Sequence, residues 1–373
     1  MKRLIPLIAG IAFIYSCNSN TNDKKTGSWQ LTGFIKADSI NPILKPSAEL
    51  NFYCPLQNRD VKWEERNVLN PAAVVKNDTV FLFFRAQDMN GTSRIGMATS
   101  TDGLHFVKSS TPLFYPANDS MKRYEWNAKR DSGTTLCNSC FDGVEDPRIV
   151  ESENGIYIMT YTAYDGKTAR LALATSKDLV NWTKHGLVLG NEKYKDQWSK
   201  SGAIVARQQG NKIIATKIGG KYWMYFGDTD IFIASSDDLI HWEVAENAEN
   251  SKMISVLHPR PGYFDSRLVE PGPYALLKEE GIVFIYNGSN AANFNDTALP
   301  RFTYAAGQAL FDKNNPPKLI DRTETYFIHP DKDYEKIGEV NEVCFVEGLV
   351  YFNSKWFLYY GTADSKIAVA VKE

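Results

Sequence analysis

The sequence has no block of like charge. Its 373 residues include 42 Lys and Arg against 44 Asp and Glu, for a formal net charge of −2 at pH 7. Proteins that bind nucleic acid or an anionic membrane surface typically concentrate basic side chains in one segment. We therefore expect no nucleic-acid partner, and a neutral or weakly charged small molecule fits the composition better as a ligand.

Motifs for several common chemistries are also missing. The five histidines are scattered, and there is no G-x-S-x-G nucleophile elbow and no phosphate-cradling glycine loop. Cys137 and Cys140 form a lone "CNSC" without a second pair of ligands nearby, so a local disulfide or two free thiols is expected rather than zinc. With Cys54 and Cys344 they allow three disulfide pairings, which the sequence leaves open. We expect no metal and no organic cofactor.

One short apolar run opens the chain. Lys2 and Arg3 precede an apolar segment over residues 4–15, which is too short to span a bilayer and stands where a signal peptide belongs. The run ends in "IYSC", which resembles the lipobox of bacterial lipoproteins, so Cys17 is the predicted lipidation site. We expect an exported cell-envelope lipoprotein, periplasmic or on the cell surface and held to the membrane by its N-terminal lipid, or otherwise a secreted protein.

These signals divide the chain into three parts. Residues 1–16 are the predicted signal peptide. Residues 17–40 combine the lipid-anchor cysteine with a polar stretch typical of a flexible tether. Residues 41–373 are the predicted catalytic domain.

Aromatic strand patterns with a polar end recur along this domain. Their starts lie roughly 60 to 76 residues apart, the spacing of multi-strand units, and no long amphipathic helical window separates them. The pattern predicts an all-β fold, a five-bladed β-propeller, because a large β-sandwich does not explain why each unit repeats the same order of signals. The five segments are Val80–Asp88, Ile156–Asp165, Lys221–Asp230, Ile282–Asn290 and Lys355–Asp364.

Three of the units continue with a second motif. An alternating strand is followed by a Ser/Asp turn around Asp102, Asp178 and Asp238. These turns resemble the Asp-box turns of other propellers, which rigidify the sheets and carry no chemistry. We expect them to be structural.

Four of the five aromatic strands follow a shorter apolar strand that opens on a polar residue, and the segment "KSGAIVA" from Lys200 can fill this slot in the less regular third unit. If the shorter strand is innermost, one end of all five converges on a single pocket. Asp146 is preferred over Glu145 because strand neighbours point to opposite faces, and because Asp146-Pro147 takes the slot of Asn70-Pro71 and Glu270-Pro271. The residues expected around the axis are Asn70, Asp146, Lys200 or Ser201, Glu270, and Glu342 or Asn341.

Asp146 and Glu270 are the predicted catalytic pair. Two carboxylates across a pocket are the minimum equipment for hydrolysing a glycosidic bond, because one protonates the departing oxygen while the other activates water. The alternative for either residue is a structural carboxylate that accepts backbone hydrogen bonds at a strand end.

The remaining candidates are predicted to bind substrate. Arg85 sits in an apolar strand, where a charge is costly unless it is paired or faces a wet cavity, so it clamps a sugar hydroxyl or an anion, or forms a buried salt bridge. Arg148 shares the pocket-facing side with Asp146 and can lower the pKa of that acid or bind an anion. The other predicted binding residues are Asn70, Asp88, Lys200, Asp228 and Asp364, although most acids that close the aromatic strands are expected to be turn acids.

Several motifs together resemble glycoside hydrolase family 130, five-bladed propellers that act on β-mannosides. They are "NPAAVV", "FLFFRAQD", "GVEDPRIV", "GKYWMY" and "LYYGTAD", and the resemblance covers about Asn51 to the C-terminus. It implies an inverting mechanism in which Asp146, in "EDPR", is the acid and acts through a hydroxyl of the mannose itself. It also implies that most relatives are phosphorylases, in which basic side chains hold inorganic phosphate in place of water.

The chain departs from the phosphorylase pattern in two places. Phe226 and Gly227 stand where phosphorylases tend to carry a His-Arg pair, and "RLVEPGP" installs Glu270 where they have small residues. A carboxylate there repels phosphate and can deprotonate water. Both departures match the family's minority of exo-acting β-1,2-mannosidases. Asp228 can share the role of base, and Lys200 can still hold an anion.

The sequence therefore predicts an inverting exo-acting β-mannosidase that hydrolyses β-1,2-linked mannosides, with a β-mannoside oligosaccharide as its partner. The alternatives are a mannoside phosphorylase of the same family and a non-catalytic glycan-binding lipoprotein. Arabinanase-like and fructosidase-like propellers are a further alternative, but they usually open the first inner strand with a catalytic Asp-Pro where this chain has Asn70-Pro71. The oligomeric state stays open.

Overall fold

The computed structural model describes residues 29–130 and 140–373. The predicted signal peptide, the predicted lipidation site Cys17 and Cys137 lie outside these residues. Strands dominate the described part. Its helical segments are the α-helices α1 (Lys122–Glu125) and α2 (Asp333–Lys336) and the 3-10 helix η1 (Ala128–Arg130). None of the described helices is long and apolar enough to cross a bilayer. The prediction of an all-β fold is confirmed.

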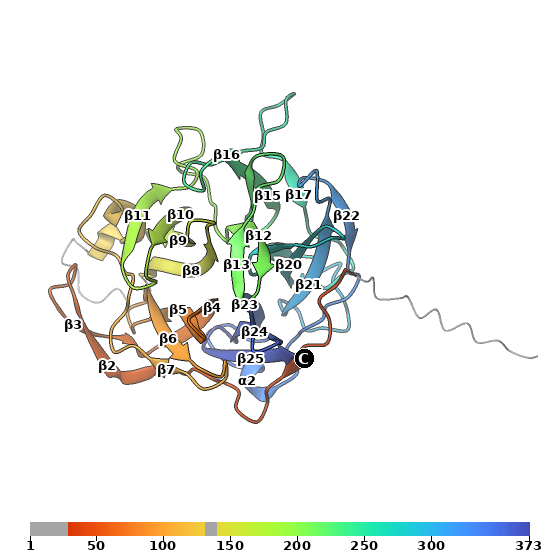
Figure 1. Cartoon of the computed structure of the whole chain (residues 1–373). Helices are drawn as coiled ribbons and strands as arrows, with labels where there is room; N and C mark the ends of the chain where they lie inside the picture. Colours follow the sequence, from red (N-terminus) through yellow and green to blue (C-terminus); the bar gives the residue numbers. More distant parts are fainter. Residues whose placement is uncertain (1–28, 131–139) are drawn as a thin grey trace, which may run out of the picture.

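Most strands pair with their neighbours in the sequence and form antiparallel groups (Figure 1). The first group contains β4 (Asn67–Lys76), β5 (Thr79–Gln87), β6 (Thr92–Ser100) and β7 (Val107–Lys108). The second contains β8 (Asp142–Glu151), β9 (Tyr157–Tyr164), β10 (Ala169–Ser176) and β11 (Trp182–Leu187). The third contains β12 (Ala203–Gln209), β13 (Lys212–Ala215), β14 (Tyr222–Phe226), β15 (Ile231–Ser236), β16 (Glu243–Val244) and β17 (Ser255–Leu257).

The C-terminal part of the chain continues the pattern. One group contains β18 (Leu268–Pro271), β19 (Ala275–Leu277), β20 (Ile282–Ser289), β21 (Tyr304–Phe311) and β22 (Leu319–Arg322). A four-stranded sheet combines β23 (Cys344–Phe352), β24 (Lys355–Thr362) and β25 (Lys366–Lys372) with β1 (Ile35–Lys36) from the other end of the chain. The strands β2 (Ser47–Cys54) and β3 (Arg59–Glu64) form a separate hairpin. Figure 1 shows the groups arranged around a common centre, a propeller-like layout in which the number of blades stays a prediction.

The pairing of β1 corrects one predicted boundary. Ile35 and Lys36 pair with Val371 and Ala370 of β25, and the buried Trp29 donates from its indole to the carboxylate of Asp321 at 3.0 Å. A buried aromatic ring and backbone pairing with another strand both hold a segment against the folded domain. A segment held in this way is not a flexible tether. The prediction of a flexible tether over residues 17–40 is therefore wrong for residues 29–40, which belong to the folded domain.

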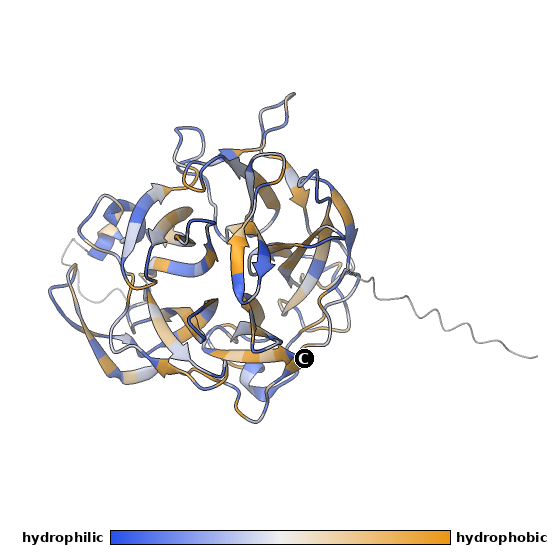
Figure 2. Cartoon of the chain, viewed as in Figure 1, coloured by the Kyte–Doolittle hydropathy of each residue, from blue (hydrophilic) through white to orange (hydrophobic). Residues whose placement is uncertain are grey.

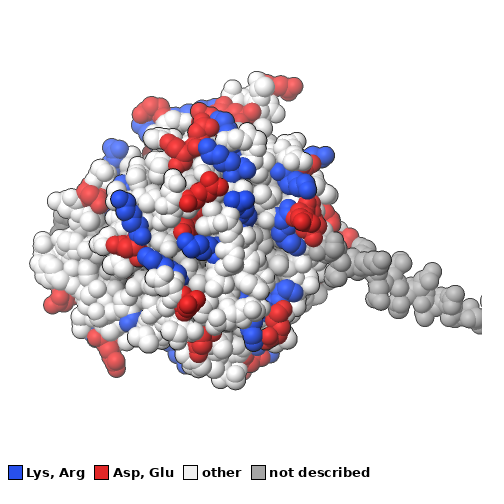
Figure 3. Space-filling model, in the orientation of Figure 1, with Lys and Arg blue, Asp and Glu red and all other residues white. Residues whose placement is uncertain are grey.

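Side chains of the strands form the hydrophobic core, which lies between neighbouring sheets. Figure 2 shows hydrophobic residues along the strands and hydrophilic ones in the connecting loops. Large side chains such as Trp63, Phe83 and Tyr225 are fully buried. On the face shown in Figure 3, basic and acidic side chains are interspersed rather than gathered into a patch of one sign.

The three predicted structural turns are confirmed. Ser100 Oγ accepts from the backbone of Gly103 at 2.9 Å, while Asp102 Oδ1 accepts from the backbone of Leu104 and His105, both at 2.8 Å. The turns at Asp178 and Asp238 repeat this pattern. Their acids are therefore occupied by the backbone of their own turns.

The structure also answers part of the question of which cysteines form disulfides. Cys54 and Cys344 are buried free thiols, which excludes any pairing that involves either of them. Cys140 is disulfide-bonded, and its partner lies outside the described residues. The local disulfide with Cys137 stays a prediction.

Candidate active site

Three polar residues near the centre of the propeller-like fold share an unusual backbone conformation. Asn70, Asp146 and Ser201 all have a left-handed backbone, with φ of 47°, 50° and 60°. The ladder register shifts at the first two, between Leu69 and Pro71 and between Glu145 and Arg148. Such bulges re-aim a side chain at some cost in backbone strain and are concentrated at functional sites. Contacts between these slots show the predicted convergence: Asn70 donates to Asp146 at 3.0 Å, and Ser201 donates to Glu270.

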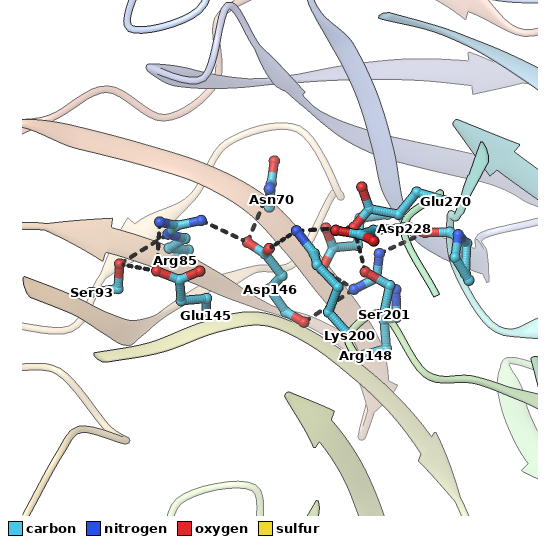
Figure 4. A network of polar contacts seen from close by, with 12 residues as sticks. Asn70, Arg85, Ser93, Glu145, Asp146, Arg148, Lys200, Ser201, Asp228 and Glu270 are labelled. Atoms are coloured by element: carbon cyan, nitrogen blue, oxygen red, sulfur yellow. Dashed lines mark hydrogen bonds and ion pairs between the residues drawn. The ribbon is translucent and has the colours of Figure 1, made fainter. Parts of the chain in front are cut away.

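Asp146 lies at the middle of a network of polar contacts (Figure 4). Its side chain is only 1% exposed; Asn70 Nδ2 donates to its Oδ1 at 3.0 Å, and Arg85 Nη1 lies 3.3 Å from the same oxygen. Lys200 Nζ lies 3.5 Å from Oδ2. Burial by itself disfavours the charged form, but the charges of Arg85, Lys200 and Arg148 and the Asn70 hydrogen bond outweigh it and lower the pKa of Asp146. Asp146 is thus ionised among these charges.

Glu270 faces the same lysine from the other side. Its Oε1 lies 3.1 Å from Lys200 Nζ and accepts a hydrogen bond from Ser201 Oγ. Burial raises the pKa of Glu270 and the charge of Asp228 adds to this, whereas Lys200 opposes it. Glu270 therefore has a higher proton affinity than an ordinary glutamate, as a general base near neutral pH requires.

Lys200 also sets the separation of the two carboxylates. Its Nζ contacts Asp146 Oδ2 at 3.5 Å and Glu270 Oε1 at 3.1 Å, so these oxygens lie at most about 6.6 Å apart, the sum of the two contacts. Inverting glycosidases hold their carboxyl groups roughly 6.5–9.5 Å apart to admit a water. The upper limit for these two oxygens thus coincides with the short end of that range.

Arg85 is held in a buried ion pair, one of the two alternatives that the sequence allowed. Its Nη2 lies 2.7 Å from Glu145 Oε1, and its Nε donates to Ser93 Oγ at 3.0 Å, which in turn donates to Glu145 at 3.0 Å. The pKa of Glu145 is raised by burial, and the charge of Arg85 opposes this. Glu145 and Ser93 therefore fix the guanidinium, whose second edge faces Asp146 (Figure 4).

Arg148 connects the two halves of the site through the backbone. Its Nη1 donates to the carbonyl of Asp146 at 3.1 Å, its Nη2 to that of Pro271 at 2.6 Å, and its Nε to that of Gly272 at 2.7 Å. The side chain thereby ties the strand of Asp146 to the strand of Glu270. Its charge contributes to the lowered pKa of Asp146, while its donors are engaged by these three carbonyls and by the carboxylate of Glu347.

Glu347 in β23 is a site residue that the sequence analysis missed. Its carboxylate is fully buried, its Oε1 lies 3.3 Å from Arg148 Nη1, and burial raises its pKa well above the usual range. The sequence analysis chose Glu342 or Asn341 for this slot, but Asn341 is exposed and Glu342 partly exposed, and neither contacts the network. The sequence does contain a signal that points to Glu347, because this glutamate stands inside the apolar run "CFVEGLV".

Three of the acids near the ends of aromatic strands were predicted to bind substrate, and their surroundings differ. Asp88 accepts from the backbone of Asn90 and Thr92 and pairs with Arg94 at 2.9 Å, so it is a turn acid outside the network. Asp228 borders the network, where its charge acts on both Lys200 and Glu270. Asp364 also borders it: burial raises the pKa of Asp364 to about 6, and the charge of Asp146 adds to this.

No group of three or more His, Cys, Asp or Glu side chains within residues 29–130 and 140–373 is arranged as a metal site. The network instead places six carboxyl groups around three cations, Arg85, Arg148 and Lys200. The carboxyl groups are those of Glu145, Asp146, Asp228, Glu270, Glu347 and Asp364. A propeller-like all-β fold with opposed carboxylates at its centre defines the class as a glycoside-active enzyme.

The family follows from comparison with known proteins. The model of glycoside hydrolase family 130, described as beta-1,4-mannooligosaccharide phosphorylase, matches residues 35–373. The chain therefore belongs to glycoside hydrolase family 130. It is 30% identical to a 1,2-beta-oligomannan phosphorylase of Thermoanaerobacter sp. (strain X514) over 91% of this chain and 97% of the relative.

Similar solved structures are also described as glycoside hydrolases. A putative glycoside hydrolase from Parabacteroides distasonis is 44% identical, with a TM-score of 0.86 over 92% of this chain and 97% of that one. A second structure is 40% identical, with a TM-score of 0.87 over 92% and 94% of the two chains. It is described with the statement that this family of mannoside phosphorylases contains glycoside hydrolases that target beta-1,2 mannosidic linkages in Candida mannan.

Proposed function

We propose that the protein is an inverting, exo-acting β-mannosidase that hydrolyses β-1,2-linked mannosides with water as the nucleophile. The observation that carries this proposal is Glu270, buried and ion-paired to Lys200 across from Asp146. A carboxylate in this position is suited to deprotonate a water and repels a phosphate dianion. The relatives named as phosphorylases favour phosphorolysis as the second candidate, but the structures described as glycoside hydrolases share a higher identity with this chain.

The cations of the site support hydrolysis. Arg85 and Lys200 are each engaged by two carboxylates, and Arg148 by three carbonyls and Glu347. A phosphate ion would have to compete with these fixed negative partners for every one of the three. Phosphate binding is therefore disfavoured in the network that the described residues form.

The first departure from the phosphorylase pattern, at Phe226 and Gly227, has a structural basis. Phe226 packs into the core 5.9 Å from the ring of Phe232. Gly227 has φ of 132°, and a Cβ there would lie 2.0 Å from the carbonyl oxygen of Asp230. An arginine at position 227 is incompatible with this backbone, so neither position supplies a phosphate ligand.

In the proposed mechanism, Asp146 gives a proton to a hydroxyl of the bound mannose. That hydroxyl passes its own proton to the glycosidic oxygen as the bond from that oxygen to the anomeric carbon breaks. Water attacks the anomeric carbon from the opposite face and transfers a proton to Glu270. Lys200 and Arg85 keep Asp146 ionised before substrate binds, so Asp146 has to take up a proton from solvent before it can donate one. This uptake requires that the inserted sugar hydroxyl weakens the contact of Asp146 with Lys200 and so raises the pKa of Asp146.

Two wider expectations belong to the same proposal. The antiparallel groups correspond to five blades, with β1 completing the sheet of β23 to β25. The protein is exported as a lipoprotein anchored through Cys17, or otherwise secreted.

The test is product analysis of β-1,2-mannobiose incubated with and without inorganic phosphate, with Asp146→Asn as the inactive control. Release of free mannose at the same rate in both buffers supports hydrolysis. Formation of mannose 1-phosphate that depends on phosphate overturns the proposal in favour of phosphorolysis. Binding of mannobiose without any product from the unmodified protein overturns it in favour of a glycan-binding protein.

A further inference from the structure

An exposed tryptophan stands on a loop that is itself firmly held. Trp198 lies two residues before Lys200, and its side chain is 49% exposed. The next residue, Ser199, donates its backbone N–H to the carbonyl of Ala169 at 3.0 Å and accepts from the backbone of Leu171 at 3.1 Å. Arg170 donates to the carbonyl of Lys195 at 2.9 Å on the other side of Trp198. The exposure of the indole is therefore not a result of a loose loop.

The indole is fixed from two sides. Its Nε1 donates to Asp228 Oδ2 at 2.6 Å, and its ring meets the ring of Tyr164 edge-on, with centroids 6.2 Å apart and planes at 65°. Edge-to-face pairs of this kind are favourable and orient both rings. With the N–H satisfied and the orientation set, what remains free on Trp198 is apolar ring surface.

These two partners place Trp198 beside the catalytic network. Asp228 acts electrostatically on Lys200 and Glu270. Tyr164 ends β9, and its Cα pairs with Gly143 of β8, two residues before Glu145. The ring of Trp198 thus bridges the Glu270 side and the Glu145 side of the site.

We propose that Trp198 is the platform on which a sugar ring of the bound β-mannoside stacks, and that it determines specificity for a carbohydrate next to the reacting linkage. Sugar rings present a C–H face that pairs with an aromatic surface, while their hydroxyls reach polar groups at the edge. Ligand sites typically combine such an aromatic wall with a few fixed polar groups. This inference rests on the proposed β-mannoside substrate, but it does not depend on whether water or phosphate is the nucleophile.

The experiment compares Trp198→Ala, Trp198→Phe and a matched control, Tyr53→Ala. Tyr53 is an exposed aromatic residue on β2, which Figure 1 places at the periphery. Affinity for β-1,2-mannobiose is measured by calorimetry in the non-turnover Asp146→Asn background, and KM and kcat in the active one. Loss of the ring is expected to weaken binding and raise KM about tenfold with kcat changed less. Trp198→Phe, which keeps a ring but removes the N–H, is expected to stay close to the unmodified protein, and Tyr53→Ala to be unchanged.

The outcomes separate this inference from the proposed function. Mannobiose that binds with the same affinity when Trp198 is replaced by Ala overturns the platform and leaves the proposed function standing. An equal loss in Trp198→Phe and Trp198→Ala overturns it as well, because the hydrogen bond to Asp228 and not the ring would then carry the effect. Absence of any β-mannoside binding by the Asp146→Asn protein overturns both.

Discussion

Lys200 Nζ lies 3.1 Å from Glu270 Oε1, and this contact opposes the effect of burial on the pKa of that carboxyl group. The pKa of Lys200 itself is raised well above its usual value, burial being outweighed by the charges of Glu270 and Asp146, so the lysine stays charged at working pH. The same cation holds Asp146 ionised. One side chain thus tunes both members of the proposed catalytic pair.

Lys200→Met is expected to move the acid limb of the kcat/KM profile to higher pH by about one unit. Without the lysine, the raised pKa of Glu270 rises further, and the base becomes protonated at a higher pH. The pH profile of mannobiose turnover measures this, with Lys195→Met, at a partly exposed lysine paired with Glu192, as the matched control. A limb that stays in place or moves to lower pH contradicts the assignment of Glu270 as the base.

Asp146→Asn and Glu270→Gln are each expected to lower kcat by roughly 10²- to 10⁴-fold, the usual contribution of a general acid or base. Both substitutions keep the shape of the side chain, so mannobiose still binds. Steady-state kinetics and calorimetry measure the two effects. Glu342→Gln is the control, since this half-exposed residue lies outside the network. A Glu270→Gln protein with nearly full activity would transfer the role of base to another carboxylate, and Asp228 is the next to test.

Arg148→Met is expected to destabilise the fold by about 3–5 kcal/mol, because it leaves Glu347 buried without its cation and frees three backbone carbonyls. Urea denaturation measures the free energy of unfolding. Adding Glu347→Gln to Arg148→Met is expected to recover part of the loss, because the uncompensated charge is removed. A double variant no more stable than Arg148→Met alone would show that the two residues are not coupled.

Asp364→Asn is expected to raise the melting temperature at pH 8, with a gain that shrinks as the pH falls toward 4. Burial raises the pKa of Asp364 from 3.8 to about 6, so the folded protein holds a proton there that the unfolded chain releases. The ionised form destabilises the fold as pH rises from about 4 through 6, and asparagine removes this cost. The exposed Asp60→Asn serves as the control in thermal unfolding at several pH values. A gain that is the same at every pH contradicts the argument.

Much of the fold was predictable because its signals are local and repeated. Aromatic strands, Ser/Asp turns and the polar residue before proline all recur within each unit, and the shared slot of Asp146 and Glu270 made both visible. Lys200 and Ser201 were the two residues predicted for the polar position of the third unit, and both lie in the network. Ser201 has the left-handed backbone and donates to Glu270, while Lys200 bridges the two acids.

The misses have common physical reasons. Glu347 was missed because the register shifts between Val346 and Gly348, and a bulge changes which residues face the centre without a clear trace in the pattern. The packing of residues 29–40 depends on partners such as Val371 and Asp321, more than 280 positions away along the chain. Asp88 was assigned to binding because a turn acid and a pocket acid at a strand end look alike in sequence.

The central claim is that water attacks with inversion while Asp146 and Glu270 supply the acid and the base. Time-resolved proton NMR of β-1,2-mannobiose turnover in phosphate buffer tests it most directly, because each sugar product has its own anomeric signal. The account predicts that α-mannose appears first from the nonreducing sugar, before mutarotation, and that no mannose 1-phosphate accumulates. Mannose 1-phosphate as the main product, or β-mannose as the first anomer from that sugar, would contradict it.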